Sequence, residues 1–296
     1  MQKLVPHLWY DKEAVEAANW YVSLFEASSI LNITTITDTP SGDAEIVDFQ
    51  LAGFRFSAIS AGPYFKFNPS ISLMVACSTA EEVDRLYASL SKGGTELMPL
   101  GEYPFSKRYV WLQDKYGLSW QLMLDEDRKD LQKIRPSMLF AGDVCGRAKE
   151  AIDYYLSVFE EADKGLINNY ADGEAADQRA KINYGEIDIL KTQLVVMDHG
   201  YGGDFTFNEA FSFMVLCDNQ EEIDYYWDKL SYVPEAEQCG WLKDQFGLSW
   251  QIVPADLNEI LFRGSEEEVQ RITQEFLKMK KFDLKDLEQA RLGLSD

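Results

Sequence analysis

The sequence predicts an α+β protein made of two homologous domains, because blocks of sequence recur in the same order in its two halves. Residues 114–121 (DKYGLSWQ) recur 130 positions later as residues 244–251 (DQFGLSWQ). Residues 72–77 (SLMVAC) recur 140 positions later as residues 212–217 (SFMVLC). The order is kept while the spacing drifts, so the two copies are expected to share their elements and to differ in loop length.

Each copy has the pattern of two consecutive β-α-β-β-β units. In the first unit, a strand at Leu4–Tyr10 precedes a helix, and three runs rich in β-forming residues follow between residues 30 and 61. In the second unit, a strand at Ile71–Cys77 precedes a helix, and the last strand lies at residues 118–124. Strands outnumber helices, so each helix is expected to cover one face of a curled mixed sheet and to leave a cleft on the other face. The apolar helix stripes behind this prediction are Val15, Ala18, Val22 and Phe25; Val83, Leu86, Tyr87 and Leu90; Ala148, Ile152, Tyr155 and Phe159; and Ile223, Tyr226, Trp227 and Leu230.

The two domains are expected at residues 1–126 and 135–255, joined by a charged linker at 127–134. Residues 256–296 have no counterpart in the first half and are expected to form a helical tail. One tail helix is predicted behind three consecutive glutamates, which suit a helix N-terminus, and a second, shorter helix follows it. Their apolar positions are Val269, Ile272, Phe276 and Met279, then Leu284 and Leu287 with Arg291.

Composition excludes several classes of protein. The 296 residues include 28 Lys and Arg against 50 Asp and Glu, a formal net charge of −22. A phosphate backbone and an anionic lipid surface both require a basic face, so neither a nucleic acid nor a membrane is an expected partner. No apolar run approaches the roughly 18–20 residues that span a bilayer. The start of the chain has no secretory pattern and the four cysteines are widely spaced, so a cytoplasmic location is expected.

The repeated blocks resemble a known family. Residues 207–208 (FN), 212–215 (SFMV) and 239–254 (CGWLKDQFGLSWQIVP) are similar to PhnB-like proteins, which are often labelled 3-demethylubiquinone-9 3-methyltransferase domains. This family belongs to the vicinal-oxygen-chelate superfamily of glyoxalases, extradiol dioxygenases and bleomycin-resistance proteins. The resemblance covers nearly the whole chain. It implies tandem glyoxalase-like domains, each with two βαβββ units that form a curled mixed sheet with a cleft, followed by the helical tail.

The resemblance also implies where a divalent metal ion would bind. Metal-dependent members use His and Glu ligands, one of them a Glu four residues after the Gly of the Asp-x-x-Gly turn. Counting from Gly117 and Gly247 gives Gln121 and Gln251, which are neutral amides. The usual first-strand His maps to Val5, and its equivalents in the second units of the two domains map to Ser70 and Ala210. No cofactor is therefore expected, and a divalent metal is disfavoured.

The chain contains only two histidines. By strand alternation, His7 could face the cleft, as a polar residue that lines a cavity or the domain seam. Asp198 and His199 are weak candidates for a metal site together with Gln251, although a turn at the end of a strand explains this pair equally well.

The face of each sheet that the helices leave uncovered is expected to form an apolar trough with a few polar groups, which is typical of a ligand pocket. Three functions stay open: a metal-independent small-molecule binder, a metal-dependent lyase or dioxygenase, and a scaffold in which the tandem copies form an intramolecular pseudo-dimer, with a homodimer also open. No Gly-x-Gly-x-x-Gly segment supports a nucleotide-type methyl donor, so the methyltransferase label is judged unsupported.

The tryptophans Trp120 and Trp250 are expected in the core, and Trp111 and Trp241 either there or on the cleft wall. The residues predicted to line the troughs are Gln121, Gln251, Ser119, Ser249, Met123, Val253 and His7.

Overall fold

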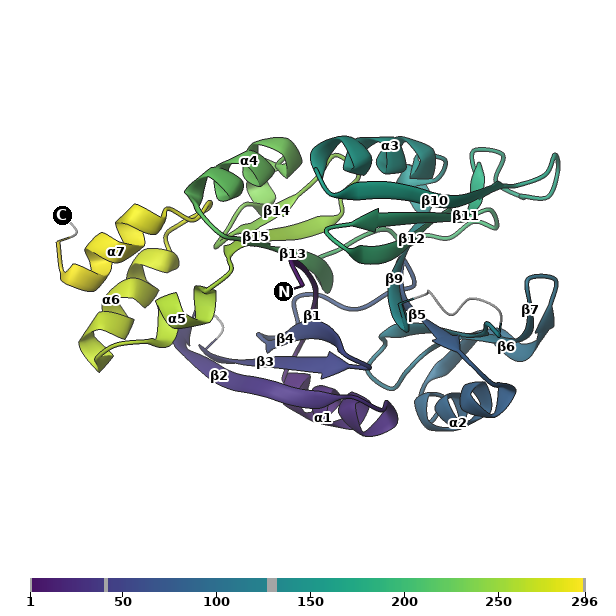
Figure 1. Ribbon diagram of the computed structural model, residues 1–296, viewed down its shortest axis with the longest axis horizontal. Helices are drawn as coiled ribbons and strands as arrows, with labels where there is room; N and C mark the ends of the chain where they lie inside the picture. Colours follow the sequence, from purple (N-terminus) through teal and green to yellow (C-terminus); the bar gives the residue numbers. More distant parts are fainter. Residues whose placement is uncertain (1, 40–41, 127–131, 295–296) are drawn as a thin grey trace.

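The computed structural model describes residues 2–39, 42–126 and 132–294, and its α+β architecture confirms the predicted fold class (Figure 1). The first half of the chain contains two β-α-β-β-β units. Unit 1 comprises β1 (Leu4–Tyr10), α1 (Ala14–Leu24), β2 (Ser29–Thr39), β3 (Gly42–Leu51) and β4 (Phe54–Ser60). Unit 2 comprises β5 (Ile71–Cys77), α2 (Ala80–Leu90), β6 (Thr95–Tyr103), β7 (Ser106–Gln113) and β8 (Ser119–Leu124).

The second half repeats these units and adds the tail. Unit 3 comprises β9 (Ile134–Phe140), a 3-10 turn (Gly142–Val144), α3 (Ala148–Val158), β10 (Ala162–Asn169), β11 (Ile182–Ile189) and β12 (Thr192–Asp198). Unit 4 comprises β13 (Phe211–Cys217), α4 (Gln220–Leu230), a 3-10 turn (Pro234–Ala236), β14 (Trp241–Lys243) and β15 (Ser249–Pro254). The tail contains α5 (Leu257–Phe262), α6 (Glu266–Phe276) and α7 (Leu284–Leu292). Most of the predicted linker, residues 127–131, lies outside the described residues.

The two units that share a sheet come from different halves of the sequence. Sheet A has the strand order β14-β15-β13-β1-β4-β3-β2, so it joins unit 1 to unit 4. Sheet B has the order β10-β11-β12-β9-β5-β8-β7-β6, so it joins unit 2 to unit 3. Each seam is an antiparallel pair of first strands, with His7 opposite Ser212 in sheet A and Ser137 opposite Ser72 in sheet B. The sequence repeats are therefore confirmed, while the partners within each sheet differ from the expected pairing inside one half.

The connections between the sheets explain this exchange of partners. Residues 61–70 lead from sheet A to sheet B, and residues 199–210 lead back. The two segments bind each other reciprocally: Asn68 Nδ2 donates to the carbonyl of Thr206 at 2.9 Å, and Asn208 Nδ2 donates to the carbonyl of Lys66 at 3.0 Å. The repeated Phe-Asn pair thus marks the point where the chain crosses between sheets.

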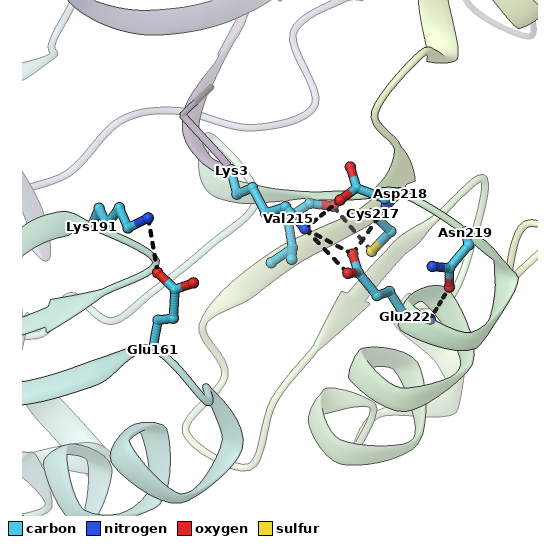
Figure 2. A network of polar contacts seen from close by, with 8 residues as sticks. All are labelled: Lys3, Glu161, Lys191, Val215, Cys217, Asp218, Asn219 and Glu222. Atoms are coloured by element: carbon cyan, nitrogen blue, oxygen red, sulfur yellow. Dashed lines mark hydrogen bonds and ion pairs between the residues drawn. The ribbon is translucent and has the colours of Figure 1, made fainter.

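A lysine clamp closes each seam at the N-terminus of a helix. Figure 2 shows Lys3, just before β1, reaching Asp218 and Glu222 at the start of α4, with Nζ–O distances of 2.7 and 3.1 Å. In sheet B, Lys133 Nζ lies 2.7 Å from Glu82 Oε1 at the start of α2. The main chains pair beside these contacts, because Leu216 N–H donates to the carbonyl of Lys3 at 2.8 Å. The acidic helix N-termini also suit the helix dipole.

The helices cover the outer faces of the sheets as predicted. Trp120 and Trp250 are fully buried, which confirms them as core residues. The predicted stripe of the first helix is displaced, because Val15 and Val22 are only partly buried. Alanines occupy three of the four buried positions of this helix. The residues that α1 buries are Ala14, Ala17, Ala18 and Tyr21.

The tail lies at one end of sheet A, away from sheet B (Figure 1). The predicted helices are present as α6 and α7, and a capping box of Ser265 and Glu268 begins α6. The short helix α5 was not predicted. After α6 the chain runs along the β14 edge, where the N–H groups of Cys239 and Gly240 donate to the carbonyls of Met279 and Lys280 at 2.8 and 2.7 Å. No helix in the described part of the chain is long and apolar enough to cross a membrane.

Candidate functional site

Strand alternation places the candidate polar residues on the inner faces of the sheets, opposite the helices. Trp250 packs on Tyr155 of α3, with ring centroids 5.5 Å apart. Its neighbours Ser249 and Gln251 therefore lie on the other face of β15. Tyr10 bonds to Tyr21 of α1, so the odd-numbered residues of β1 also lie on the inner face. The register then aligns one polar row across sheet A: Ser249, Ser212, His7, Ser57 and Asp48.

The inner face of sheet A and the tail enclose a cavity of about 110 Å³, called the sheet A cavity below. Its floor comes from all seven strands of sheet A, and its cover comes from α5 and the end of α6. The wall is mostly aliphatic, with a few polar groups at its centre, as in many ligand sites. The lining residues that matter here are His7, Asp48, Arg55, Ser57, Gln251 and Asn258 among the polar ones, and Ile36, Ile46, Ile59, Met214, Leu216, Val253, Leu257, Leu261 and Phe276 among the apolar ones.

His7 is the buried imidazole of this cavity. It is 5% exposed, and its Nδ1 atom has no hydrogen-bond partner among the described residues. The Trp241 ring lies edge-on to it, with centroids 5.3 Å apart. Burial lowers the pKa of His7 to about 3, so the ring is neutral at physiological pH. A neutral imidazole offers one donor and one acceptor.

A charged pair lines the same cavity as His7. Arg55 Nη2 is 3.5 Å from Asp48 Oδ2, and Asn258 Nδ2 from the tail donates to the same oxygen at 2.9 Å. Asp48 is 6% exposed. Arg55 Nε is buried without a hydrogen-bond partner within the described chain. The Asn258 contact joins positions 210 residues apart and fixes α5 over the sheet.

The two predicted glutamines have different surroundings. In sheet A, Gln251 Nε2 donates to Ser212 Oγ at 2.9 Å, and in sheet B, Gln121 Nε2 donates to Ser72 Oγ at 2.5 Å. Gln121 Oε1 also accepts from the hydroxyl of Tyr109 at 2.7 Å. Cys239 stands 130 positions after Tyr109 and lines the sheet A cavity instead. The amide of Gln121 is thus engaged at both ends by its own sheet.

Sheet B carries the other predicted trough residues. Ser119 Oγ accepts from Trp111 Nε1 at 2.8 Å, and Met123 lies partly buried opposite Tyr109. Ser137 occupies the place of His7. The buried Arg135 donates to Tyr184 and Glu186 at 3.0 and 3.1 Å. Trp111 and Trp241, which were expected either in the core or on the cleft wall, are half-buried. Trp241 lines the sheet A cavity.

The structure separates Asp198 and His199 from Gln251, because β12 belongs to sheet B and β15 to sheet A. Both carboxylate oxygens of Asp198 are used by main-chain donors at 2.8–3.1 Å, the N–H groups of Gly146, Ala148, Lys181 and Ile182. His199 is half-buried against Phe205, with ring centroids 5.4 Å apart. Burial lowers the pKa of His199. The pair forms the turn at the end of a strand, the second of the two predicted interpretations.

The donor set does not fit a divalent metal ion. The polar row of sheet A offers three serine hydroxyls, the His7 imidazole and the Asp48 carboxylate. That carboxylate is already engaged by Arg55 and Asn258. Within residues 2–39, 42–126 and 132–294, no group of three His, Cys, Asp or Glu side chains could hold a metal. Such ions require three or four converging N, O or S donors with suitable charge.

Several residues of the cavity were missed in the sequence analysis. Arg55 is the single charge of its strand, which was an available signal for an inner-face role, whereas Asp48 is one of three acidic residues in β3. Asn258 could not be found in this way, because α5 is too short for its periodicity to be read. The sheet A cavity unites His7 and Gln251, while Gln121, Ser119 and Met123 lie together in sheet B.

Comparison with known proteins gives a family for both halves of the chain. The family model described as 3-demethylubiquinone-9 3-methyltransferase matches residues 2–123 and 132–253. The PhnB protein of Bacillus cereus is 41% identical, with 42% of this chain and 100% of that one covered and a TM-score of 0.40. A protein from Staphylococcus aureus is 32% identical, with 41% and 95% covered and a TM-score of 0.18. A search of curated proteins gives no match.

Some similar structures extend over both halves. Glyoxalase I from Zea mays is 12% identical, with 86% of this chain and 94% of that one covered, and has a TM-score of 0.53. At this identity the likeness concerns the fold alone. The likeness to this structure shows the glyoxalase-like fold, and the two matches to the family model show that this chain belongs, in a tandem form, to the PhnB-like family described as 3-demethylubiquinone-9 3-methyltransferase.

Proposed function

We propose that this protein binds a small organic molecule in the sheet A cavity and does so without a metal ion. The observation that carries the proposal is a cavity of about 110 Å³ whose wall combines aliphatic side chains with a buried, neutral His7 and the Arg55–Asp48 pair. One water molecule needs only about 10–15 Å³ measured in this way. The space is therefore large enough for a small ligand.

The unpaired polar atoms support a binding role. A buried donor or acceptor without a partner costs about 1–3 kcal/mol. His7 Nδ1 and Arg55 Nε both carry this cost, and both residues line the cavity. A ligand that hydrogen-bonds to these side chains, with small local shifts, would offset part of it. Gln251, Ser249 and Val253 belong to the same inner face, as proposed for the trough residues.

Sheet B has a supporting part in this proposal. Gln121, Ser119 and Met123 keep a trough-like placement, but Tyr109 and Trp111 already occupy the polar groups of Gln121 and Ser119. We infer an intramolecular pseudo-dimer in which sheet A binds the ligand and sheet B stabilises sheet A. A cytoplasmic location is part of the proposal, and the four cysteines are free thiols.

Metal-dependent lyase or dioxygenase chemistry is not proposed, because the amide and hydroxyl donors do not fit the ion. Methyl transfer is not proposed either, since no glycine-rich nucleotide loop occurs in the sequence.

A thermal-shift screen of small aromatic and heterocyclic compounds tests the proposal. A ligand at 100 times its Kd should stabilise the fold by about 2.7 kcal/mol. His7→Ser, which copies the sheet B residue, should abolish the shift, and Ser137→Ala in sheet B is the matched control that should keep it. Purified protein with stoichiometric zinc, nickel, manganese or iron would overturn the proposal. Thermal shifts that persist in His7→Ser and disappear in Ser137→Ala would place the ligand site in sheet B and would also overturn the proposal.

A further inference from the structure

We infer that the ligand of the sheet A cavity is an uncharged molecule with one hydrogen-bonding end and an apolar body, of the size and type of a primary aromatic amide. This inference rests on the proposed function and deepens it by naming the class of ligand. It is argued from the charge balance of the wall, the position of the polar groups and the nature of the cover.

The charges of the wall cancel. Asp48 and Arg55 are the charged members of the lining, and they face each other at 3.5 Å. His7 adds no charge, because its buried ring is neutral. A carboxylate ligand would lie beside Asp48 and compete with it for Arg55. An ammonium ligand would compete with Arg55 in the same way. Either ion would also lose its hydration, and an unpaired buried charge is strongly unfavourable.

Two polar groups of the floor are direct neighbours, and a third lies further along the same face of sheet A. His7 and Ser57 are direct neighbours across β1 and β4, and Gln251 lies two strands away on β15. A neutral imidazole, a hydroxyl and an amide each both donate and accept hydrogen bonds. The complementary ligand group therefore has both an N–H or O–H and an acceptor oxygen, as a primary amide or a lactam has.

The remainder of the wall is apolar. Ile46, Ile59 and Leu216 contribute from the sheet, and Leu257, Leu261 and Phe276 contribute from the tail. Burying an apolar body against these side chains contributes roughly 25 cal/mol per Å². The tail has no counterpart at sheet B, so the apolar cover distinguishes the sheet A cavity from the equivalent face of sheet B (Figure 1).

Three probes of the same shape test the charge argument: benzamide, benzoate and benzylammonium, titrated at pH 7 by calorimetry or by tryptophan fluorescence. Benzamide should bind at least 10-fold more tightly than either ion. Asp48→Asn leaves Arg55 uncompensated, so benzoate should gain at least 10-fold relative to benzamide. Arg55→Met leaves Asp48 uncompensated, so benzylammonium should gain by a similar factor.

Glu186→Gln is the matched control, because Glu186 holds the place of Asp48 in sheet B. It should leave all three affinities unchanged. Circular dichroism and thermal unfolding establish that each variant is folded. An ion that binds the natural protein as tightly as benzamide, or ratios that do not move in Asp48→Asn and Arg55→Met, would overturn the ligand class while leaving the binding function intact. If none of the three binds at 10 mM, the ligand class is also overturned, and the wider screen with His7→Ser decides the function separately.

Discussion

The hydroxyl of Tyr21 donates a 2.7 Å hydrogen bond to Oδ2 of Asp114, and the second half repeats this contact between Tyr155 and Asp244. Tyr21 lies on α1 in unit 1, whereas Asp114 begins the turn before β8 in unit 2. These units belong to different sheets, so the bond ties sheet A to sheet B. Strand pairing joins units 1 and 4 and units 2 and 3, while the Tyr–Asp bonds join units 1 and 2 and units 3 and 4. The four units therefore form a closed cycle of contacts.

The same aspartates explain the repeated DxxGLSWQ block. Oδ2 of Asp114 also accepts from Trp120 Nε1 at 2.9 Å, and Oδ1 accepts from the N–H groups of Tyr116 and Leu118 at 2.8 and 3.2 Å. The Gly117 φ angle of 86° suits glycine in this tight turn. The motif is thus a structural junction whose Gln faces the inner side of the sheet.

Removal of either tyrosine hydroxyl should destabilise the protein. Tyr21→Phe and Tyr155→Phe each delete one hydrogen bond to a buried carboxyl group, which costs about 1–3 kcal/mol. Urea unfolding followed by fluorescence measures the loss. Tyr232→Phe is the control, because Tyr232 is 69% exposed and its hydroxyl loss should change stability by less than about 0.5 kcal/mol. Equal effects in all three variants would contradict the junction.

The buried Asp244 should affect the pH dependence of stability. Burial raises its pKa to about 6, against the four hydrogen bonds that lower it. Between the usual Asp pKa near 4 and about 6, the folded state holds a proton that the unfolded state has released, so the contribution of Asp244 to the free energy of unfolding falls as pH rises. In Asp244→Asn this fall should be absent. Urea unfolding at intervals from pH 4 to pH 7 measures both proteins, and an identical slope in the two would refute the assignment.

The elements of this fold were predictable from local pattern, but the composition of the sheets was not. Alternation with Trp120 and Trp250 was enough to place Gln121 and Gln251 on inner faces. The partner of β1 could not be derived, because β5 and β13 have nearly the same sequence and equal propensity to pair with it. The choice depends on the crossing segments at 61–70 and 199–210, which are contacts between distant parts of the chain.

The candidate site was also predictable only in part, because strand alternation can be read from the sequence and contacts between distant segments cannot. The sequence analysis identified His7 and Gln251, whose placement follows from strand period, and their ligand-binding roles stay predictions. It did not connect them, because they lie 244 positions apart and meet only through the pairing of β1 with β13. The contact between Asp48 and Asn258 forms only when the tail packs on sheet A, and this packing leaves no periodic signal in the sequence.

The lysine clamps should contribute equally to the two seams. Lys3→Met and Lys133→Met each remove a partly exposed ion pair at a helix N-terminus, worth roughly 0.5–1 kcal/mol. The ion pairs of Lys3 raise its pKa, with the Asp218 hydrogen bond as the largest cause. Both losses should shrink in 1 M salt, because charges on the surface are screened. Lys149→Met is the control, since Lys149 forms an exposed pair within one helix and bridges no seam. A loss in Lys149→Met as large as in Lys3→Met would show that bridging the seam has no special value.

His7 should make the fold sensitive to acid. Burial lowers its pKa to about 3 from the usual 6.5, so between these values the unfolded state binds a proton that the folded state excludes. The contribution of His7 to the free energy of unfolding therefore falls as pH decreases from 6.5 toward 3, by on the order of 2 kcal/mol at pH 4.5. His7→Gln removes this contribution, and comparison of urea unfolding at pH 7 and pH 4.5 should show a smaller acid loss in the variant than in the natural protein. His199→Gln should reduce the loss less, because His199 is only half-buried. An equal acid loss in His7→Gln and the natural protein would mean that the His7 ring accepts a proton in the folded state, and the neutral wall of the sheet A cavity would then be charged at low pH.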